Sequence, residues 1–480
     1  MNKLSHLNPK RVFEIFEEIC TIPHGSSDME KISLYCENFA IKNGLNYIKD
    51  DALNVIIFKP GPKGYENSEQ IILQGHLDMV CQKEVDFEFD FLKDGIEVFE
   101  EYGYVKANKT TLGADNGIAV AMVMAILESN NIAHPPICAL FTTDEETGML
   151  GASKLDFSLI SAKKLINIDS ETEDVLTVSC AGGSDFKALF KKETENKTGT
   201  KVKLVLKGLL GGHSGVEIHK NRVNSSILSG RFLNALQKEC EFSLIDINGG
   251  DKTNAITNRT EITVCTNTPD ILKEKAVLVA NNIKNEIKDR EPNFDVLVSV
   301  LENGEFLAFS QELTKKLVCA LMLTPSGVCE MSANIDGLVE TSLNLGILKT
   351  EEDKISLHYF LRSNKTSSLV FLEERLNVFY NNLGCETKTF GHTPPWEYKE
   401  DSALKEVYKK CFKEIFVKEP KIEAIHAGLE CAIFTSKIDG IDCISLGPNI
   451  FDAHTTKERL SVESTQKIYT LLLKMLENLK

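Results

Sequence analysis

The chain contains the stretch IILQGHLD, residues 71–78, in which a short apolar run ends at a histidine and an aspartate. A short apolar run bounded by turn signals is typical of a buried strand in an α/β sheet. Open α/β sheets form their binding sites beyond the carboxyl ends of their strands. The stretch therefore predicts a core strand and a candidate site at its end.

Four further stretches place carboxylates or a histidine beside an apolar run or a glycine turn. They are GADNG at 113–117, TDEET at 143–147, NIDS at 167–170 and DAH at 452–454. Taken singly, each has an ordinary explanation, such as a solvated Glu-Glu pair or an N-cap at Asp115. Together they favour one dinuclear metal site, because His with Asp and Glu is a ligand set for divalent ions used in hydrolysis.

The chain resembles the dinuclear-zinc peptidase family that includes carboxypeptidase G-type enzymes, peptidase T and carnosinase-like dipeptidases. The similar motifs run nearly end to end: IPHGS at 22–26, QGHLDMVC at 74–81, TTLGADNG at 110–117, GGHSG at 211–215, HAGLEC at 426–431 and HTTKERLS at 454–461. Within the family, the HAGLE and GADN segments are similar to those of the Xaa-His, or aminoacyl-histidine, dipeptidases.

The resemblance implies a site for two Zn²⁺ ions, for which Mn²⁺ or Co²⁺ are possible substitutes. It divides the ligands into His76 and Asp169 on one ion, Glu146 and His454 on the other, and Asp115 bridging both.

Three further features of this site are implied by the resemblance. Glu145 would be the general base and acid, Asp78 would orient His76, and the peptide bond between Asp115 and Asn116 would be cis. Family members that act as dipeptidases or aminopeptidases carry Asp at the position of Asp169, whereas deacylases and carboxypeptidases commonly carry Glu.

The middle of the chain supplies candidate substrate contacts. The resemblance makes His213 a donor to the developing oxyanion, with an incidental histidine in a glycine-rich turn as the alternative. Asn254 and Arg362 resemble positions that hold substrate, and Arg362 would pair with a carboxylate through a bidentate fork, unless it forms a surface salt bridge. Gly428 and Glu430 would line the pocket, where Glu430 would meet a substrate ammonium or imidazole.

The positions of the ligands predict an inserted domain. Four ligand segments precede residue 183 and the fifth lies near residue 454, while the stretch between them has its own strand and helix signals. We expect an α/β fold: a mixed-sheet catalytic domain of residues 1–182 and 394–480, interrupted by an α+β lid domain of residues 183–393. The family resemblance implies that the chain forms a homodimer through this lid domain.

Composition limits the binding partners and the cellular compartment that we expect for the protein. The formal charge of −16 argues against nucleic acid or an anionic membrane as a partner. No apolar run is long enough for a membrane span, the first residues lack an export signal, and the 13 cysteines are an odd number. These features favour a cytoplasmic protein with reduced thiols.

The predicted function is a cytosolic metallodipeptidase that hydrolyses Xaa-His and related dipeptides with a metal-activated water. A tripeptide aminopeptidase or an N-acyl-amino-acid hydrolase on the same fold is the alternative. A non-catalytic relative of the fold is disfavoured, because Glu145 and every expected ligand are present.

Overall fold

The computed structural model describes residues 3–480, and the chain divides into two compact units. The first comprises the chain up to Ser179 with Tyr398–Ala424 and Leu429–Lys480, and the second comprises Cys180–Glu397 with Ile425–Gly428. The main segment of the second unit, Cys180–Glu397, begins and ends within a few residues of the predicted insertion at 183–393. The second unit also takes in Ile425–Gly428, which the sequence analysis placed in the catalytic domain.

The first unit is built on an eight-stranded mixed sheet in the order β1-β2-β6-β3-β7-β21-β8-β20. The strands are β1 Asn46–Lys49, β2 Val55–Lys59, β3 Ile71–His76, β6 Ile137–Thr142, β7 Lys164–Asn167, β8 Val175–Cys180, β20 Lys421–Ile425 and β21 Asp442–Ser445. Every residue of β3 and β6 is buried, so both faces of the central sheet are covered. The predicted α/β class with a mixed sheet is confirmed.

The central strands are parallel, which brings their carboxyl ends together. β3 pairs in parallel with β6 and β7, and β21 pairs in parallel with β7. In register, His76 lies beside Thr142 and Gln74 lies beside Asn167. The segments that follow each strand therefore leave the sheet at one edge.

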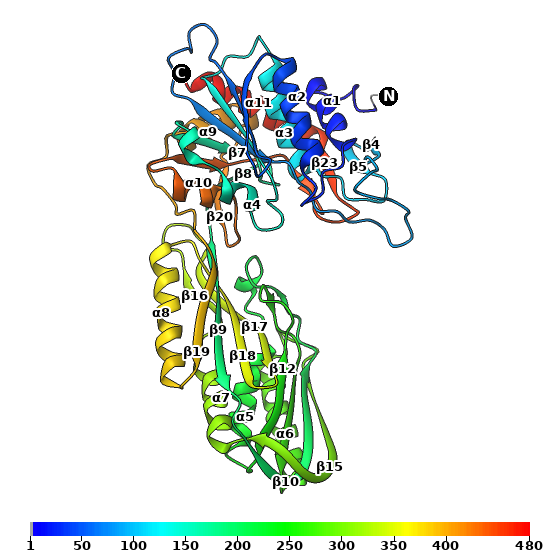
Figure 1. The fold of residues 1–480 in the computed structure, drawn as a ribbon, viewed down its shortest axis with the longest axis vertical. Coiled ribbons are helices and arrows are strands. Elements are labelled where there is room, and N and C mark those ends of the chain that lie inside the picture. The colour runs from blue at the N-terminus through cyan, green and yellow to red at the C-terminus, as the bar shows by residue number, and fades with distance from the viewer. Residues whose placement is uncertain (1–2) are drawn as a thin grey trace. The chain divides into compact units, whose positions relative to one another are not determined.

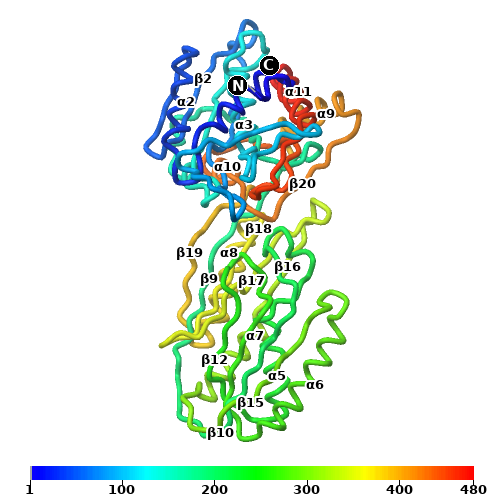
Figure 2. Tube along the Cα trace, turned by 90° about the vertical axis from the view of Figure 1, so that its right-hand side faces the viewer, coloured from blue at the N-terminus to red at the C-terminus, as the bar shows by residue number. Residues whose placement is uncertain are grey.

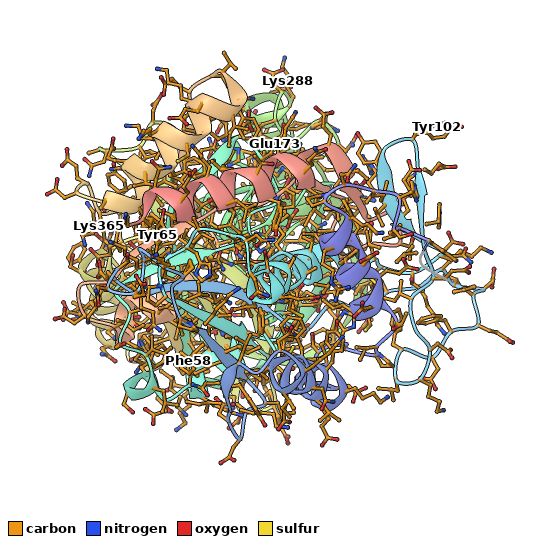
Figure 3. The ribbon with its side chains drawn as sticks, turned by 90° about the horizontal axis from the view of Figure 1, so that it is seen from above. Phe58, Tyr65, Tyr102, Glu173, Lys288 and Lys365 are labelled. Atoms are coloured by element: carbon orange, nitrogen blue, oxygen red, sulfur yellow. The ribbon has the colours of Figure 1, made fainter. Side chains whose placement is uncertain are left out.

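Helices and a small sheet complete the first unit. The helices are α1 Lys10–Cys20, α2 Glu30–Lys42, α3 Ala114–Glu128, α4 Leu150–Lys154, α9 Ala403–Phe416, α10 Cys431–Lys437 and α11 Val462–Asn478. α1 packs against α3, and α11 packs against α9 (Figure 1). The small sheet joins β4 Val98–Glu101, β5 Tyr104–Ala107, β22 Ile450–Phe451 and β23 Arg459–Ser461. Tyr102 lies exposed at the tip of the β4–β5 hairpin (Figure 3).

The second unit is a nine-stranded antiparallel sheet with helices packed against it. Its strands are β9 Gly182–Lys191, β10 Thr194–Lys207, β12 Ser243–Gly249, β14 Thr260–Thr266, β15 Asp295–Phe309, β16 Gly327–Met331, β17 Val339–Thr350, β18 Lys354–Ser363 and β19 Glu386–Thr393. Its helices are α5 Ser225–Leu236, α6 Pro269–Ile287, α7 Gln311–Leu323 and α8 Thr366–Asn382. α8 packs on β9, β18 and β19, while α5, α6 and α7 pack on the strands from β10 to β15 (Figure 2).

One helix of the second unit shows how local sequence sets an element boundary. Asn224 precedes α5, and its side chain accepts hydrogen bonds from the backbone N–H groups of Ser226 and Ile227. This is the usual action of an N-cap residue. Among residues 3–480, no helix is long and apolar enough to cross a membrane.

His426 anchors the segment Ile425–Gly428 within the second unit. Its Nε2 atom lies 2.7 Å from Ser342 Oγ, and its Nδ1 atom lies 3.3 Å from Asn364 Oδ1. Burial, with a smaller effect from the charge of Arg362, lowers the pKa of His426 to about 3. The imidazole is therefore neutral in the folded protein near neutral pH.

We expect His426 to make the second unit less stable as the pH falls. Its pKa is about 3 when folded and about 6.5 when unfolded, so the unfolded chain binds this proton more tightly. The stabilising contribution is complete above about pH 6.5 and is lost as the pH falls toward the folded value, which amounts to about 2 kcal/mol between pH 7 and pH 5. Urea unfolding at each pH should show a weaker pH dependence for His426→Asn. The exposed His219→Asn serves as control, and an unchanged slope in His426→Asn would contradict the assignment.

Candidate metal centre

Five side chains converge at the carboxyl ends of β3, β6 and β7. His76 Nε2 lies 3.1 Å from Asp115 Oδ1 and 3.4 Å from Asp169 Oδ1. His454 Nε2 lies 3.1 Å from Asp115 Oδ2 and 2.8 Å from Glu146 Oε1. Asp115 thus stands between the two imidazoles with one oxygen toward each, which is the arrangement that the predicted ligand sets require.

The donor set fits a cation. His76, Asp115 and Glu146 offer ligand atoms that all lie within 4.8 Å of one another. Glu146 Oε1 is buried and accepts no hydrogen bond of good geometry, although the imidazole of His454 is near. Buried carboxylates are costly unless a positive charge accompanies them, and a divalent ion at this place would provide it. These residues can therefore hold a metal ion.

The protonation of the cluster shows the same excess of negative charge. The hydrogen bond with Asp115 and the nearby carboxylate of Glu146 raise the pKa of His454 to about 11. Although burial lowers the pKa of His76, the neighbouring carboxylates, with Asp169 first, raise it well above its usual range. Burial raises the pKa of Asp169 to about 6. The carboxylates thus favour positive charge at both imidazoles, and a divalent cation would meet the same requirement.

Asp78 holds together two of the segments that carry site residues. Its Oδ1 atom lies 3.4 Å from His76 Nδ1 and accepts a hydrogen bond from the backbone N–H of Glu145 at 2.9 Å. Its Oδ2 atom accepts hydrogen bonds from the backbone N–H of Glu146 at 3.2 Å and from Ser26 Oγ at 2.9 Å. Asp78 therefore positions the Glu145–Glu146 pair as well as His76, which the sequence analysis did not anticipate.

Glu145 stands beside the cluster without touching the imidazoles at bonding distance. Burial raises its pKa well above the usual range, and the charges of Asp169, Glu430 and Glu146 raise it further, while His76 lowers it. A carboxylate of raised pKa can accept a proton and return it, which is the requirement for a general base and acid.

The start of α3 presents Asp115 to the cluster. Gly113 precedes the helix with φ 71°, and Asp115 itself has non-helical angles of φ −83° and ψ 103°. The side chain of Asp115 is turned toward the imidazoles, so the N-cap alternative is wrong. The peptide bond between Asp115 and Asn116 is cis, as the resemblance implies. Asn116 Oδ1 accepts the backbone N–H of His76 at 3.2 Å, and its Nδ2 donates to the carbonyl of Ile168 at 2.7 Å.

Glu458 is a participant that the sequence analysis missed. Its carboxylate is 4% exposed and accepts backbone N–H groups from the segment 112–115. Burial, with the charge of Asp115, raises the pKa of Glu458 to about 7, whereas the donated hydrogen bonds lower it. The motif HTTKERLS contains Glu458, but nothing in the spacing distinguishes it from a surface residue.

Within the second unit, the predicted substrate residues form a cluster of their own. β11 (Gly212–His213) pairs with β13 (Ala255–Ile256), and the backbone N–H of Ser214 donates to the carbonyl of Asn254 at 2.8 Å. A Cβ atom on Gly215 would lie 3.0 Å from His213 Cε1, 3.1 Å from Arg362 Nε and 2.5 Å from the carbonyl of His426. These groups therefore meet at a position that admits only glycine. Gly428 also lies in this unit.

His213 and Arg362 each have a nitrogen atom that could bind a ligand: Nε2 of His213 and Nε of Arg362. His213 Nδ1 accepts backbone N–H groups from Gly215 at 3.2 Å and Val216 at 3.1 Å, so the proton of the neutral ring is on Nε2. Arg362 is 8% exposed, lies over the Phe360 ring, and its Nε atom has no hydrogen-bond partner. Burial lowers its pKa to about 10, and no acidic residue between positions 3 and 480 pairs with it. The surface salt-bridge alternative is therefore wrong.

Glu430 differs from expectation. Its motif predicts a position on the pocket wall, but the side chain is fully buried in the first unit at 0% exposure. Its Oε2 atom accepts hydrogen bonds from Gln74 Nε2 at 2.6 Å and Thr142 Oγ1 at 2.7 Å. Two residues of the parallel strands β3 and β6 thus draw the carboxylate inward, away from a solvent-facing position.

Comparison with known proteins identifies relatives over the whole chain. A cytosol non-specific dipeptidase of Escherichia coli (strain K12) is 36% identical over 485 residues, covering 100% of this chain and 99% of that protein. The crystal structure of the aminoacylhistidine dipeptidase from Vibrio alginolyticus superposes with a TM-score of 0.93 at 34% identity, covering 99% and 98% of the two chains. The aminopeptidase PepT from Bacillus cereus shares the fold, with a TM-score of 0.57 at 16% identity and 98% and 99% coverage.

The family model for peptidase family M20/M25/M40 matches residues 72–478. This range contains all five residues that converge in the first unit and the cluster around His213 and Arg362 in the second. The resemblance inferred from the motifs is thus confirmed at the level of the family. The chain belongs to peptidase family M20/M25/M40.

Proposed function

We propose that this protein is a metal-dependent dipeptidase with Xaa-His dipeptides among its preferred substrates. The observation that carries the proposal is the convergence of His76, Asp115, Glu146, Asp169 and His454 beside the free carboxylate of Glu145. The names of two relatives above 30% identity, a cytosol non-specific dipeptidase and an aminoacylhistidine dipeptidase, support a dipeptide as the substrate.

The ligand set suits two divalent ions. His76 and Asp169 would hold one, Glu146 and His454 the other, and the two oxygens of Asp115 would serve both. Imidazole and carboxylate ligands favour Zn²⁺, with Mn²⁺ and Co²⁺ as alternatives. When bound, such ions lower the pKa of water toward neutrality and polarise the scissile carbonyl.

Proton transfer is the task of Glu145. Its carboxylate takes the proton from the attacking water and gives it to the leaving nitrogen as the carbon–nitrogen bond breaks. Asp78 supports this transfer, because it holds the backbone of Glu145 and the ring of His76 at once. Burial raises the pKa of Glu145, so the carboxyl group holds the proton from the water until the leaving nitrogen takes it.

Substrate recognition is assigned to the cluster in the second unit. His213 carries its proton on Nε2 and can donate it to the oxygen that becomes negative in the transition state. Arg362, a buried cation without an acidic partner among the described residues, suits the C-terminal carboxylate of a peptide. Asn254 and Gly428 complete the contacts. Glu430 is not among them, because its carboxylate is buried.

A homodimer through the second unit is part of the proposal, as is action in the cytosol. β15 forms one edge of the nine-stranded sheet and exposes Leu297, Val300 and Leu307. Exposed apolar residues on a long edge strand favour association with another chain.

A dipeptide panel with controlled metal content tests the function. We expect hydrolysis of carnosine and other Xaa-His dipeptides, loss of activity after chelation, and recovery when Zn²⁺, Mn²⁺ or Co²⁺ is added back. Matched tripeptides and N-acetylated amino acids serve as controls. Preferential cleavage of a tripeptide or of an acetylated amino acid would assign the protein to the alternative activities instead.

Substitutions at the adjacent residues Glu145 and Glu146 distinguish the proton-transfer role from the metal-binding role. Glu145→Gln keeps the size of the side chain and removes the base, so kcat should fall by about 10²–10⁴-fold while metal content stays normal. Glu146→Gln should lose metal first, and excess metal should partly restore its activity. Metal analysis and kcat on both variants decide the matter. Metal loss in Glu145→Gln with full loading of Glu146→Gln would reverse the two roles.

His213 is expected to act in the transition state. His213→Ala should lower kcat by about 10²-fold with unchanged metal content. Mixing dissociated His213→Ala and Glu145→Gln chains then shows which chain supplies the imidazole. If it comes from the partner of a dimer, roughly a quarter of wild-type activity should return, since half of randomly formed dimers are mixed and each has one intact site. Unchanged kcat in His213→Ala would leave this histidine as part of a glycine-rich turn.

A further inference from the structure

The carboxylate of Glu458 accepts hydrogen bonds from four backbone N–H groups that precede α3 or lie in its first turn. Oε1 accepts from Ala114 at 2.8 Å and Asp115 at 3.4 Å, and Oε2 accepts from Leu112 at 2.8 Å and Gly113 at 3.2 Å. The first N–H groups of a helix lack intrahelical partners and carry a partial positive charge, so a carboxylate is favourable there.

This contact replaces a cap that α3 does not supply itself. Gly113 occupies the N-cap position and has no side chain to accept a hydrogen bond. Asp115 lies two residues past that position, and its oxygens face His76 and His454. Glu458 therefore satisfies the backbone N–H groups up to and including that of Asp115, without using either side-chain oxygen of Asp115.

Glu458 lies on the same short turn as His454. Its backbone N–H donates to the carbonyl of Thr455 at 3.1 Å, and the N–H of Thr455 donates to the carbonyl of Asp452 at 3.2 Å. The turn is therefore closed by its own hydrogen bonds, and the Glu458 side chain fastens it to the backbone of Asp115. One residue thus joins the two segments whose side chains meet at 3.1 Å between His454 Nε2 and Asp115 Oδ2.

We propose that Glu458 is a positioning residue that sets the spacing of Asp115 and His454, and with it the affinity for the ion that these two ligands would share. The inference rests on the proposed function, because it requires a metal at this place. Glutamine has the same size as glutamate but has one acceptor oxygen, and its NH₂ group would face two of the N–H donors. The charge and both oxygens of the carboxylate are therefore needed.

The test compares Zn²⁺ affinity in wild type and Glu458→Gln by competition with a chelating dye. Outer-sphere partners of metal ligands typically contribute about 10–100-fold in affinity, and we expect a loss of that size for one of the two ions. The visible absorption of the Co²⁺-loaded protein should change as well, since its ligand geometry would shift. Glu17→Gln is the matched control. The Glu17 carboxylate also accepts two backbone N–H groups in the first unit, from Lys3 at 2.8 Å and Leu4 at 2.9 Å.

Each outcome decides for or against the proposal. Weakened binding of one ion in Glu458→Gln, with wild-type binding in Glu17→Gln, supports it. Unchanged affinity and Co²⁺ spectrum in Glu458→Gln, with only a lowered Tm, would make Glu458 a helix cap and nothing more. If Glu458→Gln does not fold, Glu458→Asp replaces it: the shorter carboxylate should cost about tenfold in affinity, at the lower end of the range for such outer contacts, and wild-type affinity would overturn the proposal. Wild-type protein that binds no divalent ion would instead overturn the proposed function.

Discussion

The site in the first unit depends on one electrostatic constraint: several carboxylates lie close together at the carboxyl ends of the parallel strands. Asp115, Glu146 and Asp169 lie around two imidazoles within a few ångströms, where water can hardly screen them. Such a group is stable when positive charge accompanies it, and the carboxylates raise the pKa values of His76 and His454, so that both imidazoles hold protons more tightly. A divalent ion would displace those protons, which links metal affinity to pH.

Two further carboxylates, which are not predicted ligands, position the segments that carry the site residues. Asp78 accepts N–H groups from the Glu145–Glu146 backbone, and Glu458 accepts those that precede and include Asp115. Asp78 and Glu458 therefore hold the backbone of the ligand segments, and the positions of the ligand side chains follow from this. This division explains how so many acidic residues lie close together: some face the metal position, while others are neutralised by backbone dipoles.

Much of the site was accessible from sequence because its ligands follow strands whose carboxyl ends meet at one edge. His76 and Asp169 could be placed in this way, and the family motifs supplied the pairing with Glu146 and His454. Glu458 could not be found, since its role depends on a contact across 343 positions with backbone groups that have no sequence signature. Glu430 was misplaced for a related reason. The HAGLEC motif indicates that Glu430 lies near the site. The direction of its side chain, however, is set by hydrogen bonds from Gln74 and Thr142, which lie on buried strands of the sheet.

The order of the strands has a consequence for how the protein is made. β21 lies between β7 and β8 in the sheet, although residues 181–397, almost all of the second unit, are translated between β8 and β21. On the ribosome, β7 and β8 therefore emerge long before the strand that separates them. The second unit has its own core, so it can fold during this interval while the first waits. His454 and Glu458 emerge later still, which makes the metal position one of the last parts of the first unit to form.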